Sequence, residues 1–236
     1  MCQWRRSRRL YSQLVQLWER LRSDGFEFLH MVLTVRNCSG DDLNSTIDSM
    51  YRNSSRLLKD DCFVAFKGAL RFLEVTYNAK RGDYHPHLHF LCVVRKSYFT
   101  SRYYVKRRLL ADKWAEYMRL DYDPIQSLFI GKADEGSVSE VAKYCVKPFD
   151  FDSLRRSEER LVYETLHFAL HGRRMIQSYG VMRQYLHDIG VDSLEADTEA
   201  EATQQDIHDD NNNSTAPTVQ MMDMVFNALH GSYEFT

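Results

Sequence analysis

Alternate positions in residues 84–90 carry three histidines, His85, His87 and His89. Side chains of a β-strand alternate between its two faces, so on a strand these three imidazoles would share one face. Imidazoles aligned in this way can converge on one metal ion. A structural zinc site is an alternative, but such sites close with four ligands, and no matching cysteine pair lies nearby. The stretch therefore predicts a metal site.

A second group of chemically capable residues is Glu140, Tyr144 and Lys147, which are spaced by four and by three residues. On a helix this spacing places all three on one face. A tyrosine flanked by a carboxylate and an ammonium, together with a histidine metal site, suggests phosphoryl transfer with a tyrosine nucleophile. Glu140 could instead be only the third residue of a capping box opened by Ser137. Taken singly, Tyr144 and Lys147 would be an ordinary core residue and a helix-end cation.

The histidines require a strand that holds them in register. Residues 70–77 and 85–94 are β-rich runs, and the turn-rich residues 78–83 join them. An antiparallel hairpin is therefore predicted. Pro86 has no backbone donor, so it should lie near the start of its strand or on an edge.

Helices and further strands must surround this hairpin. Apolar periodicity and capping residues predict helices at 4–23, 41–58, 101–120, 137–146, 156–170 and 175–187. Two further strands are predicted at 28–35 and 125–130. This mixture predicts an α+β fold, with a central antiparallel sheet covered by helices.

The net charge of −2 conceals two regions of opposite sign. The first 190 residues hold all 31 Lys and Arg and 23 of the 33 Asp and Glu, a net charge of +8, whereas residues 191–236 carry −10. A basic body indicates a polyanionic partner, most often nucleic acid. The alternative is that the asymmetry serves solubility only.

The acidic region predicts a change of organisation after the first 190 residues. A globular domain at 1–190, an acidic flexible linker at 191–218 and a short C-terminal tail at 219–236, with a short docking helix, are expected. The linker and tail together form the acidic C-terminal tail that is expected to be disordered.

Composition also limits where the protein works. No apolar run approaches the roughly 20 residues that cross a bilayer, and the N-terminus lacks the apolar region of a signal peptide. Five scattered cysteines suit a reducing compartment. A cytoplasmic protein with no membrane partner is expected.

Four collinear segments resemble one protein family. They are the strand at 33–37, the strand at 73–77, the pair His87 and His89, and residues 140–147. In this order they are similar to the plasmid rolling-circle replication initiators, the Rep proteins of the HUH (His-hydrophobe-His) endonuclease superfamily. The resemblance runs from about residue 2 to residue 192, and the acidic tail has no counterpart in it.

The resemblance implies a set of metal ligands. His87 and His89 would be the paired ligands, Leu88 the packed residue between them, and Glu74 the third ligand on the adjacent hairpin strand. His85 competes with Glu74 for the third place because it shares the face. Mg²⁺ and Mn²⁺ should both serve as the cofactor, and Mn²⁺ should bind more tightly because imidazole disfavours Mg²⁺.

The resemblance also implies a catalytic cycle. Tyr144 would attack the scissile phosphate, leaving a 5′-phosphotyrosine and a free 3′-hydroxyl that primes synthesis. Glu140 would be the general base of the closing step, and Lys147 would steady the phosphate or the phenolate. The expected partners are plasmid origin DNA, single-stranded at the nick site, and, as a second candidate, a host helicase.

Other functions compete with this expectation. A noncatalytic origin-binding regulator could share the fold. A relaxase or transposase of the same superfamily is a second alternative, disfavoured by the single-tyrosine helix with Glu140 four residues before Tyr144 and by the lack of a helicase-sized extension. Family members begin with a cysteine pair of which Cys2 would be the second member, so the N-terminus is expected to be truncated.

Overall fold

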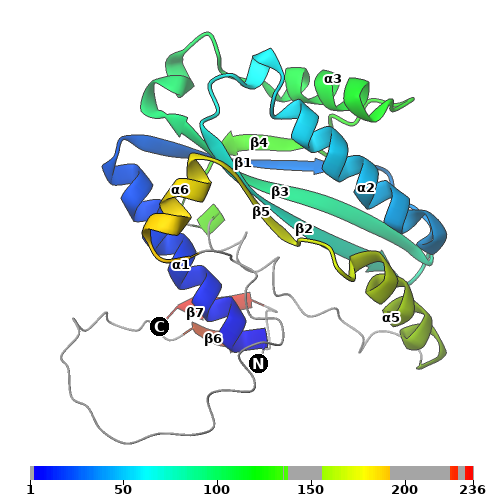
Figure 1. The fold of residues 1–236 in the computed structure, drawn as a ribbon. Helices are drawn as coiled ribbons and strands as arrows, with labels where there is room; N and C mark the ends of the chain where they lie inside the picture. The colour runs from blue at the N-terminus through cyan, green and yellow to red at the C-terminus, as the bar shows by residue number, and fades with distance from the viewer. Residues whose placement is uncertain (1–2, 135, 138–155, 192–223, 228–231, 236) are drawn as a thin grey trace, which may run out of the picture. The chain divides into compact units, whose positions relative to one another are not determined.

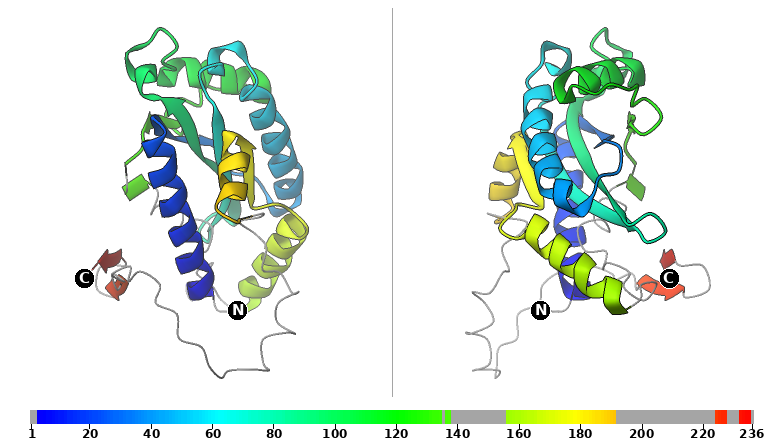
Figure 2. Two further views of the ribbon diagram at one scale, coloured as in Figure 1. Left: turned by 60° about the vertical axis from the view of Figure 1, so that its left-hand side comes forward. Right: turned by 90° about the vertical axis from the view of Figure 1, so that its right-hand side faces the viewer.

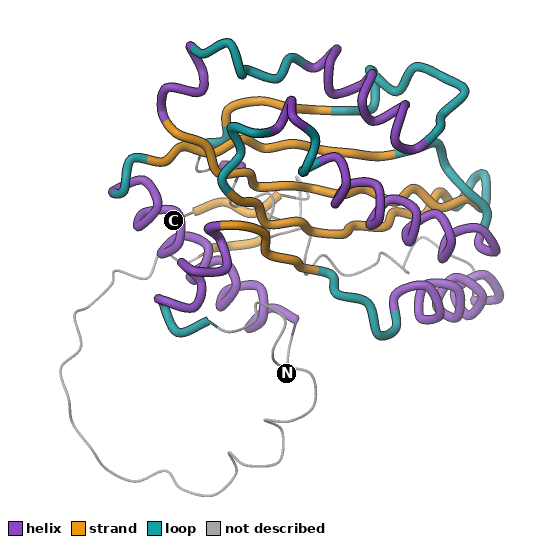
Figure 3. Tube along the Cα trace, turned by 45° about the horizontal axis from the view of Figure 1, so that its top comes forward, coloured by secondary structure: helices purple, strands orange, loops and turns teal. Residues whose placement is uncertain are grey.

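The computed structural model describes residues 3–134, 136–137, 156–191, 224–227 and 232–235. The chain divides into two compact units, Met1–Thr198 and Glu199–Thr236. The first unit contains a five-stranded sheet in the order β4-β1-β3-β2-β5, in which every neighbouring pair is antiparallel (Figures 1 and 3). Its strands are β1 (Phe26–Thr34), β2 (Gly68–Asn78), β3 (Asp83–Arg95), β4 (Phe129–Lys132) and β5 (Ile176–Gly180).

The predicted hairpin is confirmed as β2 and β3, which pair along their whole length from Gly68 opposite Val93 to Asn78 opposite Asp83. On its other side β3 pairs with β1, and this pairing ends at Thr34 opposite His87. Pro86 lies one residue beyond that end, near the start of β3, as its missing donor requires.

Helices cover both faces of the sheet (Figures 1 and 2). The first face is packed by α2 (Gly40–Leu57), α3 (Arg107–Met118) and α5 (Arg156–Leu170), and the second by α1 (Gln3–Ser23) and α6 (Val181–Asp188). Two short 3₁₀ helices lie at Asp61–Phe63 and Lys96–Thr100. The expected α+β fold with a helix-covered antiparallel sheet is therefore confirmed.

The two faces differ in how far their apolar cover reaches along the strands. On the first face, alternate residues of β3 from Tyr84 to Val94 are all buried, and all except Pro86 belong to one apolar cluster. On the second face, Trp18 of α1 stacks on Phe28 of β1 at 4.1 Å between ring centroids, and the apolar cluster of α1 and α6 extends to Leu91. Beyond that point the second face carries histidines, so the sheet itself separates core from candidate site.

The prediction of a single helix at 175–187 is wrong, because its first half is strand β5 and only Val181–Asp188 is helical. The junction is Gly180, whose φ of 57° and ψ of −137° are open essentially to glycine alone. A Cβ at Gly180 would lie 2.2 Å from the carbonyl oxygen of Lys67. Close approach of this turn to the start of β2 therefore decides where the helix begins.

Two further boundaries differ from the predicted ones. The helix expected at 101–120 begins at Arg107, because the backbone N–H of Val105 donates to the buried Tyr98 hydroxyl at 2.9 Å and holds the preceding residues out of the helix. The strand expected at 125–130 begins at Phe129, because Ser127 N–H bonds to the Pro124 carbonyl at 3.0 Å and closes a turn first.

The prediction of a short docking helix within residues 219–236, in the C-terminal unit, is wrong. Its described residues form two antiparallel strands, β6 (Met224–Asn227) and β7 (Ser232–Phe235). Of the linker predicted at 191–218, only Val191 is described, and it is buried against the cluster of α1 and α6. None of the helices in the described part of the chain is long and apolar enough to cross a membrane.

Candidate metal centre on the second sheet face

Strand register brings the predicted metal ligands onto one face of the sheet. His87 of β3 lies directly opposite Glu74 of β2 on one side and opposite Thr34 of β1 on the other. Directly opposed residues of antiparallel strands share a face, and so do residues two apart on one strand. His85, His87, His89 and Glu74 therefore all belong to the second face, as the sequence predicted.

His89 and Glu74 are in direct contact. The Nε2 atom of His89 lies 3.1 Å from the Oε2 atom of Glu74, and the two side chains are only 6% and 12% exposed. The second ring nitrogen of His89, Nδ1, lies 3.4 Å from Nε2 of His30 on β1. His89 is thus held from both neighbouring strands, with one nitrogen toward a carboxylate and the other toward an imidazole.

His85 is bound to the end of β1. The Thr34 hydroxyl lies 2.7 Å from the Pro86 carbonyl oxygen, which can only accept, so the hydroxyl donates there. Nε2 of His85, 2.8 Å from the same hydroxyl, must then donate its hydrogen to Thr34 Oγ1. Burial lowers the pKa of His85, and a hydrogen bond to the Val35 backbone opposes this. His85 therefore uses its Nε2 atom to bind the end of β1, and only its Nδ1 atom remains as a donor for a metal.

His87 lies between the other two histidines, with ring centroids 4.1 Å from His85 and 6.0 Å from His89. Burial lowers the pKa of His87 to about 4, and the neighbouring His85 adds to the effect, while Glu74 opposes it. A histidine with this pKa is neutral at pH 7 and keeps a lone pair for a metal.

The donor chemistry fits a divalent cation in part. The 3.1 Å between His89 Nε2 and Glu74 Oε2 is a hydrogen-bond distance, and it also matches the roughly 3.0 Å between two ligands at right angles around an ion that lies about 2.1 Å from each. Within the described residues, however, no group of three or more His, Cys, Asp or Glu side chains is gathered closely enough to hold an ion. The described face therefore has two adjacent donors in place and His87 beside them.

The predicted catalytic residues Tyr144, Glu140 and Lys147 lie outside the described residues. Their roles stay predictions, and so does the helix expected at 137–146.

Sequence reasoning missed His30. It lies in the middle of the mostly apolar strand Phe26–Thr34, is 6% exposed, and also packs against Phe129 at 5.5 Å between ring centroids. A histidine with apolar neighbours on both sides was the available signal, but only strand pairing shows that it faces His89.

Comparison with known proteins gives one consistent result. The family described as "Replication protein" matches residues 1–226. A protein named "Protein rep" from Streptococcus pneumoniae serotype 2 (strain D39 / NCTC 7466) is 30% identical over 83% of this chain and 62% of its own length. Proteins of the same name from Lactiplantibacillus plantarum and Staphylococcus aureus are 30% and 34% identical, over 83% and 64% of this chain and 66% and 68% of their own lengths.

The chain thus spans slightly less than two thirds of the length of the pneumococcal and lactobacillar relatives. No solved structure matches the chain.

Proposed function

This chain belongs to the plasmid replication protein family, and on that premise we propose that it initiates rolling-circle replication as a metal-dependent enzyme that nicks and rejoins single-stranded origin DNA. The observation that supports the chemistry is the buried contact between His89 and Glu74, beside His87 on one sheet face. Plasmid origin DNA is the proposed substrate, and the host helicase expected as a second partner stays a prediction.

His87, His89 and Glu74 are the proposed ligands of Mg²⁺ or Mn²⁺. Glu74 is favoured over His85 as the third ligand because it already lies beside His89, whereas His85 donates to Thr34. When bound, the ion would polarise the scissile phosphate and neutralise charge that develops on it. The His30 contact would fix the ring orientation of His89, as partners of metal-bound histidines commonly do.

Tyr144 is the proposed nucleophile. Its phenol has a reference pKa of about 10, so it must lose its proton before it attacks efficiently. The phenolate oxygen forms a bond to phosphorus, the bond from phosphorus to the 3′-oxygen breaks, and that oxygen takes up a proton as it leaves. The products are a 5′-phosphotyrosine and a free 3′-hydroxyl.

Glu140 and Lys147 are assigned to the steps around this attack. Glu140 would accept a proton from the water or strand hydroxyl that resolves the phosphotyrosine in the closing step. Lys147 would stabilise the phenolate or the phosphate with its positive charge. Both assignments rest on the spacing around Tyr144 and on the resemblance to the replication initiators.

A covalent-adduct assay tests the proposal. The full chain is incubated with Mn²⁺ and 5′- or 3′-labelled single-stranded origin oligonucleotides, and products are separated on a denaturing gel. Tyr144→Phe should abolish the adduct while DNA binding persists. Glu140→Gln should allow the first cleavage and slow release by about 10²- to 10⁴-fold, so that adduct accumulates.

Two results would contradict the proposal. An adduct that persists in Tyr144→Phe would place the nucleophile on another residue. A wild-type chain that binds origin DNA but never cleaves it with Mn²⁺ would be a noncatalytic regulator.

A further inference from the structure

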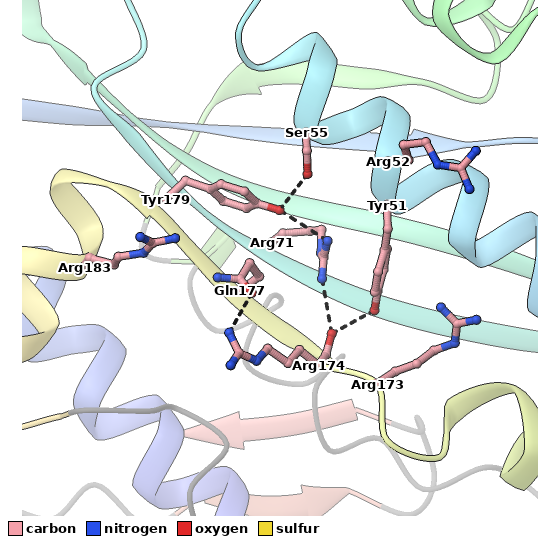
Figure 4. A pocket seen from close by; sticks show the side chains of 9 residues that line it. All are labelled: Tyr51, Arg52, Ser55, Arg71, Arg173, Arg174, Gln177, Tyr179 and Arg183. Atoms are coloured by element: carbon pink, nitrogen blue, oxygen red, sulfur yellow. Dashed lines mark hydrogen bonds between the residues drawn. The ribbon is translucent and has the colours of Figure 1, made fainter.

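A second polar site lies on the first face of the sheet, at the edge formed by β5 (Figure 4). It is a pocket of about 570 Å³ whose lining contains five arginines and no acidic side chain. The lining residues are Tyr51, Arg52, Ser55, Arg71, Arg173, Arg174, Gln177, Tyr179 and Arg183. The predicted metal ligands contribute nothing to it.

Strand pairing and helix periodicity assemble this pocket from segments far apart in sequence. Arg71 of β2 lies opposite Gln177 of β5, and Tyr179 is two residues further along the same face. From above the sheet, α2 presents Tyr51 and Ser55, which are four residues apart and share one side of the helix. Helix α2 also supplies Arg52, the connection from α5 to β5 supplies Arg173 and Arg174, and the first turn of α6 supplies Arg183.

Arg71 is the buried centre of the pocket. It is only 4% exposed, and its guanidinium lies 3.4 Å from the centroid of the Tyr51 ring. Its hydrogen bonds go to neutral acceptors, the Tyr179 hydroxyl at 3.3 Å and the Arg174 carbonyl at 3.2 Å, and its Nε atom has no partner (Figure 4). A buried cation normally has an anionic partner, since desolvation of an unpaired charge is costly.

The surrounding arginines leave this charge uncompensated. Across the parts of the chain that the structure describes, Arg173 is the one arginine of the pocket with a carboxylate partner, Asp48. Arg52, Arg174 and Arg183 are exposed and have no such partner there. The pocket therefore concentrates positive charge around a buried guanidinium, which is the arrangement expected for an anion site.

We propose that this pocket binds the phosphodiester backbone of DNA at a point separate from the nick site. Guanidinium groups match phosphate oxygens with paired, charge-assisted hydrogen bonds. The Arg71 guanidinium covers a face of the Tyr51 ring, and both tyrosine hydroxyls are bound to protein groups, so the exposed arginines are the main groups that the pocket offers to a ligand. The contact would therefore hold DNA without reading its sequence.

The position of the pocket determines which part of the DNA it can reach. Arg71 is on the face of β2 opposite to that of Glu74, so the sheet separates the pocket from the histidines. A DNA segment bound here is not the segment at the metal site. The inference rests on membership of the replication protein family and not on the nicking chemistry.

The test compares two variants of equal charge in the full chain. Arg52→Gln/Arg183→Gln removes two exposed arginines of the pocket, and Lys96→Gln/Arg102→Gln removes two exposed cations outside it. Binding of a labelled DNA duplex of arbitrary sequence is measured by fluorescence anisotropy over a series of salt concentrations, without divalent metal so that no cleavage occurs.

The pocket variant should bind at least about tenfold more weakly at low salt, and its slope of log affinity against log salt should be smaller by about two. The control variant should keep most of the affinity and slope. Arg71→Lys, which keeps the charge but loses the planar fork, should also weaken binding, with its thermal unfolding measured alongside.

Equal losses in the pocket and control variants would overturn the proposal. The proposal would also be overturned if the wild type and the pocket variant bound DNA equally, but only the wild type bound a labelled nucleoside triphosphate. The site would then take a small phosphate ligand and not DNA. Cleavage of a short single-stranded oligonucleotide that spans only the nick should persist in the pocket variant. That measurement separates failure of this site from failure of the nicking reaction.

Discussion

Replacing His30 by leucine should weaken metal binding although His30 is not a proposed ligand. His30 Nε2 lies 3.4 Å from Nδ1 of His89, a residue that is 5% exposed and whose other nitrogen faces Glu74. Leucine fills a similar volume but cannot orient the His89 ring. We expect looser placement of Nε2 and a lower affinity for Mn²⁺.

The structure sets the size of this effect. Loss of an outer partner of a metal-bound histidine typically costs about 10- to 100-fold in affinity. The His30–His89 distance is longer than the roughly 2.9–3.0 Å of a typical hydrogen bond, so the lower end is expected. A tenfold loss corresponds to about 1.4 kcal/mol of binding free energy.

Titration of the full chain with Mn²⁺, followed by calorimetry or by the electron spin resonance of free Mn²⁺, measures this affinity directly. His30→Gln retains a polar group and should recover part of the loss. Phe129 is 47% exposed and also contacts the His30 ring, so Phe129→Leu trims a contact of His30 that does not involve His89 and should leave Mn²⁺ affinity unchanged.

A second measurement separates orientation from folding. Thermal unfolding without metal reports the cost of leaving the His89 nitrogen without this partner, about 1–3 kcal/mol. If His30→Leu lowers stability but the folded protein binds Mn²⁺ as the wild type does, the reasoning is refuted and His30 is a packing residue only.

Three further predictions concern the third ligand, a capping carboxylate and a turn. Glu74→Gln should reduce Mn²⁺ affinity more than His85→Ala does in the same titration, because Glu74 lies beside His89 whereas His85 is bound to β1. If His85→Ala had the larger effect, His85 would be the third ligand. Asp60→Asn should lower the free energy of unfolding by about 1 kcal/mol near pH 7. Hydrogen bonds, above all the one from the Cys62 backbone N–H, lower the pKa of Asp60. The stabilisation by Asp60 is therefore full above the ordinary carboxyl pKa of about 3.9 and declines as the pH falls below it. Urea titrations of the wild type and Asp60→Asn would contradict this if their difference in unfolding free energy were the same at pH 7 and pH 3. Gly172→Ala should lower the free energy of unfolding by about 1 kcal/mol, because its φ is positive, and Gly180→Ala should lower it by more. Both positions have positive φ, but only at Gly180 would the added Cβ clash with a backbone atom, the Lys67 carbonyl oxygen. Equal urea midpoints for the two variants would count against the clash.

The histidine face could be predicted because its signal is local. Alternation along one strand and a short turn to the next are enough to place His87, His89 and Glu74 on one side of a hairpin. The antiparallel sheet covered by helices follows from similar local patterns, and its strand β3 agrees closely with the predicted one.

Local patterns failed where a distant segment decided the structure. The stretch at 175–187 has helical periodicity, but its first residues find hydrogen-bond partners on β2 and the turn at Gly180 packs against Lys67. Strands β2 and β5 are far apart in the sequence, so no short window contains both. The late start of α3 has a more local cause, the bond from the Val105 N–H to the Tyr98 hydroxyl, which helical periodicity does not encode.

By itself the sequence determined the strand that carries the histidines, the charge asymmetry and the family. Tertiary structure alone decided that His30 faces His89, that His85 is bound to Thr34, and that arginines from β2, α2, α6 and the α5–β5 connection surround one pocket. The physical reason is that a side chain's face is set by its own strand or helix, whereas its neighbours are set by pairing and packing between elements, which the periodicity of one element does not encode.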